Sequence, residues 1–147
     1  MLDKKKTLYK ITKNGKFNIN VMEPFNNLSI DFLGDFSMEL KSDKKIYKFP
    51  DLIYLVFWTN YNKVKKLKEK FISKNMRLGR GLIYHICPSN VPTNFIYSFF
   101  FGLLSGNSNI VKVPSKSFPE KNIILSIINK LFKKKKYLPL KNSNFFI

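Results

Sequence analysis

Residues 81–115 read GLIYHICPSNVPTNFIYSFFFGLLSGNSNIVKVPS, and this stretch decides the fold because apolar runs alternate in it with turn signals. GLIYHI is a compact strand candidate, and CPSNVP follows it as a turn. NFIYSFFFGLLSG then predicts a buried helix of about three turns that ends at Gly106. NIVKV predicts a second short strand, closed by Pro114 and Ser115. The order strand, helix, strand indicates parallel pairing in an α/β layer.

The segment that follows continues this pattern. PEKNIILSIINKLFKKKK, residues 119–136, predicts a helix that opens with Pro119 and Glu120 and ends in four lysines, an arrangement that complements the helix dipole. Two parallel strands make an incomplete sheet, because parallel strands need neighbours and cover on both faces. We therefore expect the tail YLPLKNSNFFI to begin the next connection or strand, and the chain to be the front part of something larger.

The first half of the chain predicts a small strand-rich region and a long helix. Residues 7–21 alternate apolar and polar positions around Asn14-Gly15, which predicts a hairpin of two short strands. Residues 28–48 are expected to be further strands or irregular structure, with Gly34 and Ser42-Asp43 as breakers. A helix is predicted from Pro50 to about Asn75, apolar first and basic later, as for a helix that leaves the core midway. These patterns divide the chain into residues 1–49 and 50–147.

The charge of the chain is strongly positive, +18 from 27 basic and nine acidic residues, which invites a nucleic-acid interpretation. Only Arg77 and Arg80 are arginine, however, and specific readers of bases and phosphates favour arginine for its bidentate fork. Abundant Lys, Asn, Ile, Phe and Tyr together are what an AT-rich coding sequence produces. We therefore expect non-specific adhesion and no specific nucleic-acid partner.

The location is expected to be cytoplasmic. A single cysteine, Cys87, excludes an internal disulfide and fits a reducing compartment. The basic N-terminus has no apolar stretch behind it, so it does not form a signal peptide. The longest apolar runs, LIYLVFW and FIYSFFFGLL, are shorter than the roughly 20 residues that cross a bilayer, so no transmembrane segment is predicted.

Candidate site residues lie where the two predicted strands end, because open α/β sheets bind ligands at that edge. Asn90, held between Pro88 and Pro92, presents an amide that could stabilise an oxyanion; the alternative is that Asn90 caps the following helix. Lys112 could reach a ribose or phosphate, or could be an ordinary surface lysine. No G-x-G-x-x-G follows the first strand, so the common dinucleotide motif is missing.

Two further side chains have simpler interpretations. His85 is expected to be a satisfied core or edge histidine, because a Cys-His pair needs a third orienting group and none is visible in the sequence. Cys87 is expected to be a small buried apolar residue. No group of His, Cys or carboxylate residues has metal-ligand spacing.

The segment CPSNVPTNFIYSFFFGLLSGNSNIVKVPSK resembles the start of the nucleotide-binding domain in the aldehyde dehydrogenase superfamily. Asn-Val-Pro, Leu-Leu-Ser-Gly-Asn and Ile-Val-Lys-Val-Pro-Ser match most closely the LuxC-type acyl-CoA reductases, the reductase component of bacterial bioluminescence. The resemblance is strong over about residues 79–118. It implies that residues 50–147 are the incomplete N-terminal part of an aldehyde-dehydrogenase-like Rossmann domain, with strand-helix-strand-helix order.

The same resemblance implies roles for individual residues. Asn90 would be the oxyanion-hole amide, and the cofactor-binding residues would be Pro88, Ser89, Lys112 and Ser115, with Lys112 and Ser115 at the adenosine ribose or its 2′-phosphate. Gly106 and Asn107 would link the helix to the second strand. The implied reaction is the NADP(H)-dependent reduction of a long-chain acyl-CoA, or of an acyl group from a partner protein, to a fatty aldehyde through a cysteine thioester.

The chain departs from the family at the nucleophile, which in the family lies well downstream of this motif. Cys87 does not match that position, so the resemblance implies that the nucleophile is absent and that the remainder of the reductase is a partner. Two alternatives stay open: a basic module for nucleic acid or membrane surfaces that uses the lysines of residues 63–70 and Lys133 to Lys136, and a non-functional remnant.

Overall fold

A computed structural model of the chain describes residues 18–71 and 75–147. Helices and strands alternate along the second half, as the sequence predicts, whereas residues 27–71 are mostly helical. Within the described residues, no helix combines the length and the apolar character that a membrane span requires. The elements in chain order are α2 (Asn27–Ser42), the 3-10 helix η1 (Lys44–Lys48), α3 (Pro50–Thr59), α4 (Tyr61–Phe71), β1 (Leu82–Ile86), α5 (Asn94–Leu104), β2 (Ser108–Lys112), α6 (Pro119–Phe132), η2 (Lys135–Tyr137), α7 (Leu138–Lys141) and β3 (Asn144–Phe146).

The strands form a parallel sheet in the order β1-β2-β3. Leu82 pairs with Ser108 at one end of the first ladder, and Ile86 pairs with Lys112 at the other. β3 continues the sheet beyond β2 through the pairs Asn109 with Asn144 and Val111 with Phe146. The predicted α/β class is thereby confirmed, as is the expectation that the tail begins another strand.

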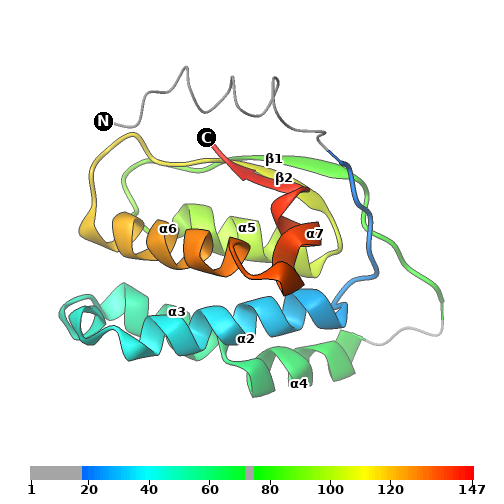
Figure 1. The fold of residues 1–147 in the computed structure, drawn as a ribbon, viewed down its shortest axis with the longest axis horizontal. Helices are drawn as coiled ribbons and strands as arrows, with labels where there is room; N and C mark the ends of the chain where they lie inside the picture. The colour runs from blue at the N-terminus through cyan, green and yellow to red at the C-terminus, as the bar shows by residue number, and fades with distance from the viewer. Residues whose placement is uncertain (1–17, 72–74) are drawn as a thin grey trace.

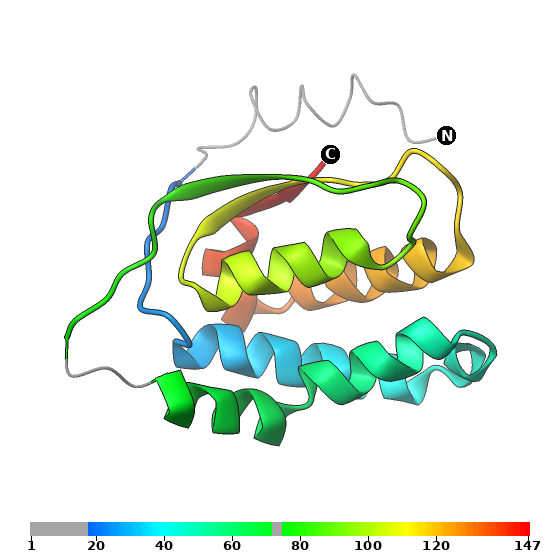
Figure 2. The ribbon, with the colours of Figure 1, turned by 180° about the vertical axis from the view of Figure 1, so that it is seen from behind.

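The molecule has three layers, which Figures 1 and 2 show from opposite sides. The sheet forms the first layer, α5 and α6 cover one of its faces, and α2, α3 and α4 form the layer farthest from the sheet. On the opposite face of β1, Leu82, Tyr84 and Ile86 are exposed. Among the residues that the structure describes, the helices therefore build a core on one side of the sheet only.

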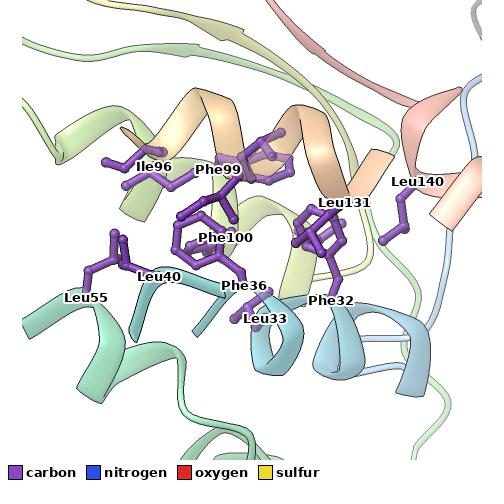
Figure 3. Packing of buried hydrophobic residues seen from close by; sticks show 14 of the residues in the cluster. Phe32, Leu33, Phe36, Leu40, Leu55, Ile96, Phe99, Phe100, Leu131 and Leu140 are labelled. Carbon is purple, nitrogen blue, oxygen red and sulfur yellow. The ribbon is translucent and has the colours of Figure 1, made fainter. Parts of the chain in front are cut away.

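The core lies between α2 and the α5–α6 layer, and Figure 3 shows its side chains meeting there. Phe32 on α2 packs against Phe99 and stacks on Phe132, and Phe36 meets Phe100 edge to face. Burying one such ring stabilises the fold by roughly 1.5–3 kcal/mol. Core packing therefore accounts for Phe95, Phe99 and Phe100 in FIYSFFFGLL, whereas Phe101 is exposed.

The end of α5 is set by Gly106, as predicted. Its φ of +81° belongs to the left-handed region that glycine tolerates best. The carbonyl oxygen of Met22 also passes so close to the Gly106 Cα that a Cβ has no room. Backbone bonds from Met22 N to Gly106 O at 2.9 Å and from Phe25 N to Leu104 O at 2.6 Å hold the segment before α2 against this turn.

The prediction of strands or irregular structure over residues 28–48 is wrong. This segment forms α2 and η1, because Ile30, Leu33 and Leu40 recur at helical spacing and bury one face of α2. Gly34 does not break α2; it lies inside the helix, where the Tyr61 ring leaves little space for a larger residue. Ser42-Asp43 does end α2, as expected.

The single helix predicted from Pro50 to about Asn75 is in fact two helices. Pro50 opens α3 as expected, but Asn60 leaves the helical conformation with ψ of 129° and separates α3 from α4. The Oδ1 atom of Asn60 then accepts a bond from Asn62 N at 3.1 Å at the start of α4. Of the predicted hairpin, residues 7–17 lie outside the described residues, and residues 18–21 form no strand.

Candidate functional site

The carboxyl ends of β1 and β2 meet at one edge of the sheet. Ile86 and Lys112 are the last residues of their strands, and they are paired in register. Neighbouring strands lie about 4.8 Å apart, so residues 87–93 and 113–118 leave the sheet side by side. The structure thereby brings the two predicted groups of site residues, one after each strand, to the same edge.

The first of these loops presents its polar groups to solvent. Pro88, Ser89 and Asn90 are exposed. The N-cap of α5 is Thr93, and no side-chain bond caps the helix, so Asn90 does not act as the helix cap. Its side chain makes no hydrogen bond with the part of the chain that the structure describes, and its amide is therefore available to a ligand.

The second loop is held in place by Lys121 on α6. The Nζ atom of Lys121 donates to the carbonyl oxygen of Pro114 at 3.0 Å and to that of Lys116 at 2.7 Å. Val113 N donates to Ile147 O at 2.8 Å, which ties the start of the loop to the segment after β3. Lys112 and Ser115 themselves are exposed, so this fixed loop offers one cation and one hydroxyl group at the edge.

A buried polar network runs across the three strands beneath this edge, and sequence reasoning did not find it. His85 on β1 is buried, with its Nδ1 atom 2.7 Å from the Ser98 hydroxyl on α5 and its Nε2 atom 2.8 Å from Asn109 Oδ1 on β2. The Nδ2 atom of Asn109 donates to Asn144 Oδ1 on β3 at 2.7 Å. Asn144 Nδ2 in turn donates to Leu140 O at 2.7 Å. The prediction that His85 is a satisfied core histidine is confirmed.

The network fixes the tautomer of His85. Both hydrogens of the Asn109 amide are used, one by Asn107 O at 2.8 Å and one by Asn144, so its Oδ1 atom faces the ring as an acceptor. The ring therefore donates from Nε2, and in the neutral ring Nδ1 accepts the Ser98 hydroxyl proton. Gly102 on α5 makes room for this pair, because a Cβ there would collide with Asn109 and His85. Asparagines inside buried strands and a glycine inside the facing helix are the signals from which the network could have been found.

Cys87 does not face the open edge as a free nucleophile would. It is half-buried, packs against the core, and has its Sγ atom 3.8 Å from the carbonyl oxygen of Asn94. This position agrees with the expected role of a small apolar residue. Within residues 18–71 and 75–147, no three His, Cys, Asp or Glu side chains form a group that could hold a metal ion.

Gly106 and Asn107 form the link from α5 to β2, as predicted. Asn107 precedes β2, so it lies at the amino end of the sheet, a strand length away from Asn90 and Lys112. Its Oδ1 atom accepts bonds from Arg80 N at 2.6 Å and from Gly81 N at 3.1 Å, which fixes the turn before β1. Asn107 is therefore a structural residue of the βαβ unit.

A comparison with protein-family models matches residues 60–141, more than half of the chain, to acyl-CoA reductase (LuxC). The chain belongs to the LuxC acyl-CoA reductase family. The match extends from α4 to α7 and so includes both loops of the edge and the His85, Ser98 and Asn109 side chains of the network, but not Asn144 on β3. No match was found among curated proteins or among solved structures. The resemblance to LuxC-type reductases over about residues 79–118 is therefore confirmed, and the match extends further along the chain in both directions.

Proposed function

We propose that this chain supplies the front part of the nucleotide-binding domain of an acyl-CoA reductase that reduces long-chain acyl groups to fatty aldehydes with NADPH. The observation that carries the proposal is the register of β1 and β2, which places Asn90 and Lys112 at one edge of a parallel sheet. Parallel α/β sheets bind nucleotides at such an edge, where the loops after adjacent strands diverge. The arrangement thus supports a Rossmann-like domain formed by residues 50–147.

The side chains at the edge fit NADPH chemically. Lys112 offers a positive charge for a phosphate, Ser115 offers a hydroxyl group for a ribose or phosphate oxygen, and both are exposed. Pro88 and Ser89 line the start of the opposite loop. The first N–H groups of α5 lack a side-chain cap and point toward the same edge, where they favour anionic groups. When bound, the cofactor supplies the hydride for the reduction.

Asn90 would act on the acyl group. Its exposed amide can donate to the carbonyl oxygen of a thioester as negative charge develops on it. The thioester forms when a cysteine thiolate attacks the acyl carbon and the CoA thiolate leaves; hydride addition and loss of the cysteine thiolate then give the aldehyde. Cys87 faces Asn94 and the core and is not positioned as a nucleophile. We therefore propose that the nucleophilic cysteine belongs to the remainder of the reductase.

The open side of β1 supports docking of that remainder. β1 lies at an edge of the described sheet, and its Leu82, Tyr84 and Ile86 side chains are exposed. Soluble proteins usually protect such edges with charge, yet residues 81–111 contain no Lys, Arg, Asp or Glu in a chain of net charge +18. An uncharged strand of the remainder of the reductase, together with its connecting helix, would pair with β1 and extend the sheet.

The proposal is tested by titrating NADPH, and NADH for comparison, into the purified chain, alone and mixed with the remainder of a LuxC-family reductase. We expect Lys112→Ala to weaken NADPH binding about tenfold, the usual effect of losing a charge-assisted hydrogen bond. Lys141→Ala, an equal change of charge at an exposed position on α7, is the matched control. Failure to bind NADPH in both preparations would refute the proposal.

A further inference from the structure

A second surface of the chain, far from the sheet, carries exposed apolar side chains in a regular arrangement. On α3, Leu52, Leu55 and Thr59 face the core. The opposite side presents Ile53, Tyr54 and Phe57, which are 43%, 69% and 64% exposed. Phe57 lies four positions after Ile53 and three after Tyr54, spacings that bring side chains together on a helix, so the three form a continuous stripe. α3 is apolar on both sides, but only one side is buried in the core. An exposed apolar side of this kind indicates an interaction with a second apolar environment.

α4 adds positive charges beside this stripe. The break at Asn60 turns the chain so that the Lys63 ammonium group lies over the Phe57 ring. Lys63, Lys66, Leu67 and Lys70 occupy positions i, i+3, i+4 and i+7, and therefore share one face of α4. Leu67 is 40% exposed on that face. We call Ile53, Tyr54, Phe57 and Leu67 the apolar face, and Lys63, Lys66 and Lys70 its basic rim.

The nearby acidic residues do not neutralise this rim. Glu69 lies on the side of α4 that faces α2, where it lines a shallow hollow together with Asp31, Lys65 and Lys68. Asp51 is in the first turn of α3, ahead of the apolar face. The acidic residues of α2 form ion pairs with other lysines: Asp31 pairs with Lys136 at 2.8 Å, and Glu39 pairs with Lys130 at 2.6 Å. Within the described residues, the acidic side chains therefore form no ion pair with the basic rim, which is open to an anionic partner.

We propose that α3 and α4 form an interfacial membrane-binding surface that places the apolar face among the acyl chains and the basic rim at the headgroups of an anionic phospholipid bilayer. Aromatic rings with polar or cationic surroundings are favoured at this depth of a bilayer. Lysines extend their aliphatic stems past apolar neighbours and keep the ammonium group at the phosphates. The positive rim is complementary to anionic lipid and gives no advantage on a neutral bilayer.

The orientation that follows leaves the sheet free. α3 and α4 belong to the layer farthest from the sheet, as Figure 2 shows, so the carboxyl edge with Asn90 and Lys112 would stay open to solvent above the bilayer. Single-stranded nucleic acid also binds surfaces of rings and lysines. Ile53 and Leu67 favour the bilayer, however, because aliphatic side chains cannot stack on bases but do enter acyl chains.

The test uses the full 147-residue chain and vesicles of phosphatidylcholine, with or without about 30% phosphatidylserine. Co-sedimentation measures partitioning. We expect binding to the anionic vesicles that falls with added salt, and much weaker binding to phosphatidylcholine alone.

Variants distinguish binding through the proposed surface from non-specific adsorption of the chain to vesicles. Tyr54→Ser with Phe57→Ser should weaken partitioning by about tenfold or more. Lys66→Ala and Lys70→Ala should each weaken it about fivefold. Tyr84→Ser, an exposed aromatic on β1, and Lys141→Ala are matched controls that should bind as the parent does. Circular dichroism and thermal melting verify that each variant is folded.

Three results would overturn the proposal. The first is equal partitioning of the parent and the Tyr54→Ser, Phe57→Ser variant. The second is loss of retention on a single-stranded oligonucleotide in that variant with vesicle binding unchanged, which would assign the surface to nucleic acid. The third is a concentration-dependent dimer that the same substitutions abolish while vesicle binding persists, which would assign it to a second copy of the chain.

Discussion

The Nε2 atom of His85 lies 2.8 Å from Asn109 Oδ1, and this bond joins β1 to β2 inside the core. Neither residue has water to replace its partner, because both are buried. The pair thus connects two strands whose carboxyl ends carry the candidate site. Two predictions test this bond and the packing around it, a third tests the cap of α2, and a fourth tests the contact between Tyr137 and Asp35.

Asn109→Ala should lower the free energy of unfolding by about 2–4 kcal/mol, because it leaves His85 Nε2 and Asn144 Oδ1 without a partner in the core. Chemical denaturation measures the change. Asn122→Ala, at an exposed position on α6, is the matched control and should change it by less than about 0.5 kcal/mol. If His85→Ala and Asn109→Ala prove additive in a double-mutant cycle, the two side chains are not coupled.

Gly102→Ala should destabilise the fold although alanine is the better helix former. The added Cβ would overlap Asn109 Oδ1 and the His85 ring, so the network must shift or break at a cost of about 2–4 kcal/mol. Thermal melting compares this variant with Ser126→Ala, a substitution at an exposed position on α6. A melting temperature equal to or above that of the parent would contradict the described packing.

Asn26→Ala should cost about 0.5–2 kcal/mol, because Asn26 Oδ1 caps α2 by accepting from Ser29 N at 2.9 Å. The Nδ2 atom of the same side chain donates to Ser29 Oγ at 2.9 Å. Denaturant titration gives the change, and Asn26→Asp should retain most of the stability, since aspartate also caps helices. Loss of stability in Asn26→Asp equal to that in Asn26→Ala would show that the cap is not the cause.

Tyr137 makes stability depend on alkaline pH. Burial, the bond from its hydroxyl group to Asp35 Oδ2 at 2.8 Å and the charges of Asp35 and Asp31 raise the pKa of Tyr137 well above its ordinary value. Above about pH 10 the unfolded chain loses a proton that the folded chain keeps, so rising pH favours unfolding by about 1.4 kcal/mol per pH unit.

Tyr137→Phe should remove that part of the pH dependence while costing about 0.5–1.5 kcal/mol at neutral pH, where its hydrogen bond is lost. The measurement is the denaturation midpoint from pH 8 to pH 11. Tyr47→Phe, at an exposed position on η1, should follow the parent curve. Identical alkaline slopes for the parent and Tyr137→Phe would contradict the assignment.

The sequence was most informative where neighbouring residues alone determine the structure. The strand, turn, helix and strand of residues 81–112 are each signalled by local apolar runs, by prolines and by Gly106. α2 was missed because Gly34 resembled a breaker, and only its close contact with Tyr61 shows why a small residue is favoured inside the helix. The break at Asn60 was missed because the apolar and basic halves could equally form one continuous helix.

The His85 network could not be predicted because it joins residues far apart in the chain. Asn109 and Asn144 are separated by 35 positions, and the local sequence around one of them does not indicate that the other is its partner. The edge itself was predictable, since parallel pairing follows from the strand-helix-strand order. The exposed side of α3 was not, because its uniformly apolar sequence gives no sign of which face remains in water.

The pairing of Ile86 with Lys112 has a further consequence, because strand register changes only in whole residues. A slip of β2 by one position would turn Lys112 to the face covered by α5 and α6. A slip of two would keep its face and move its charge by about 6.6 Å along the sheet. Intermediate positions do not exist, so the alignment of Lys112 with the Asn90 loop is either right or lost. The present register lets Asn109 meet His85, so a shift of register would also break this buried hydrogen bond and destabilise the core.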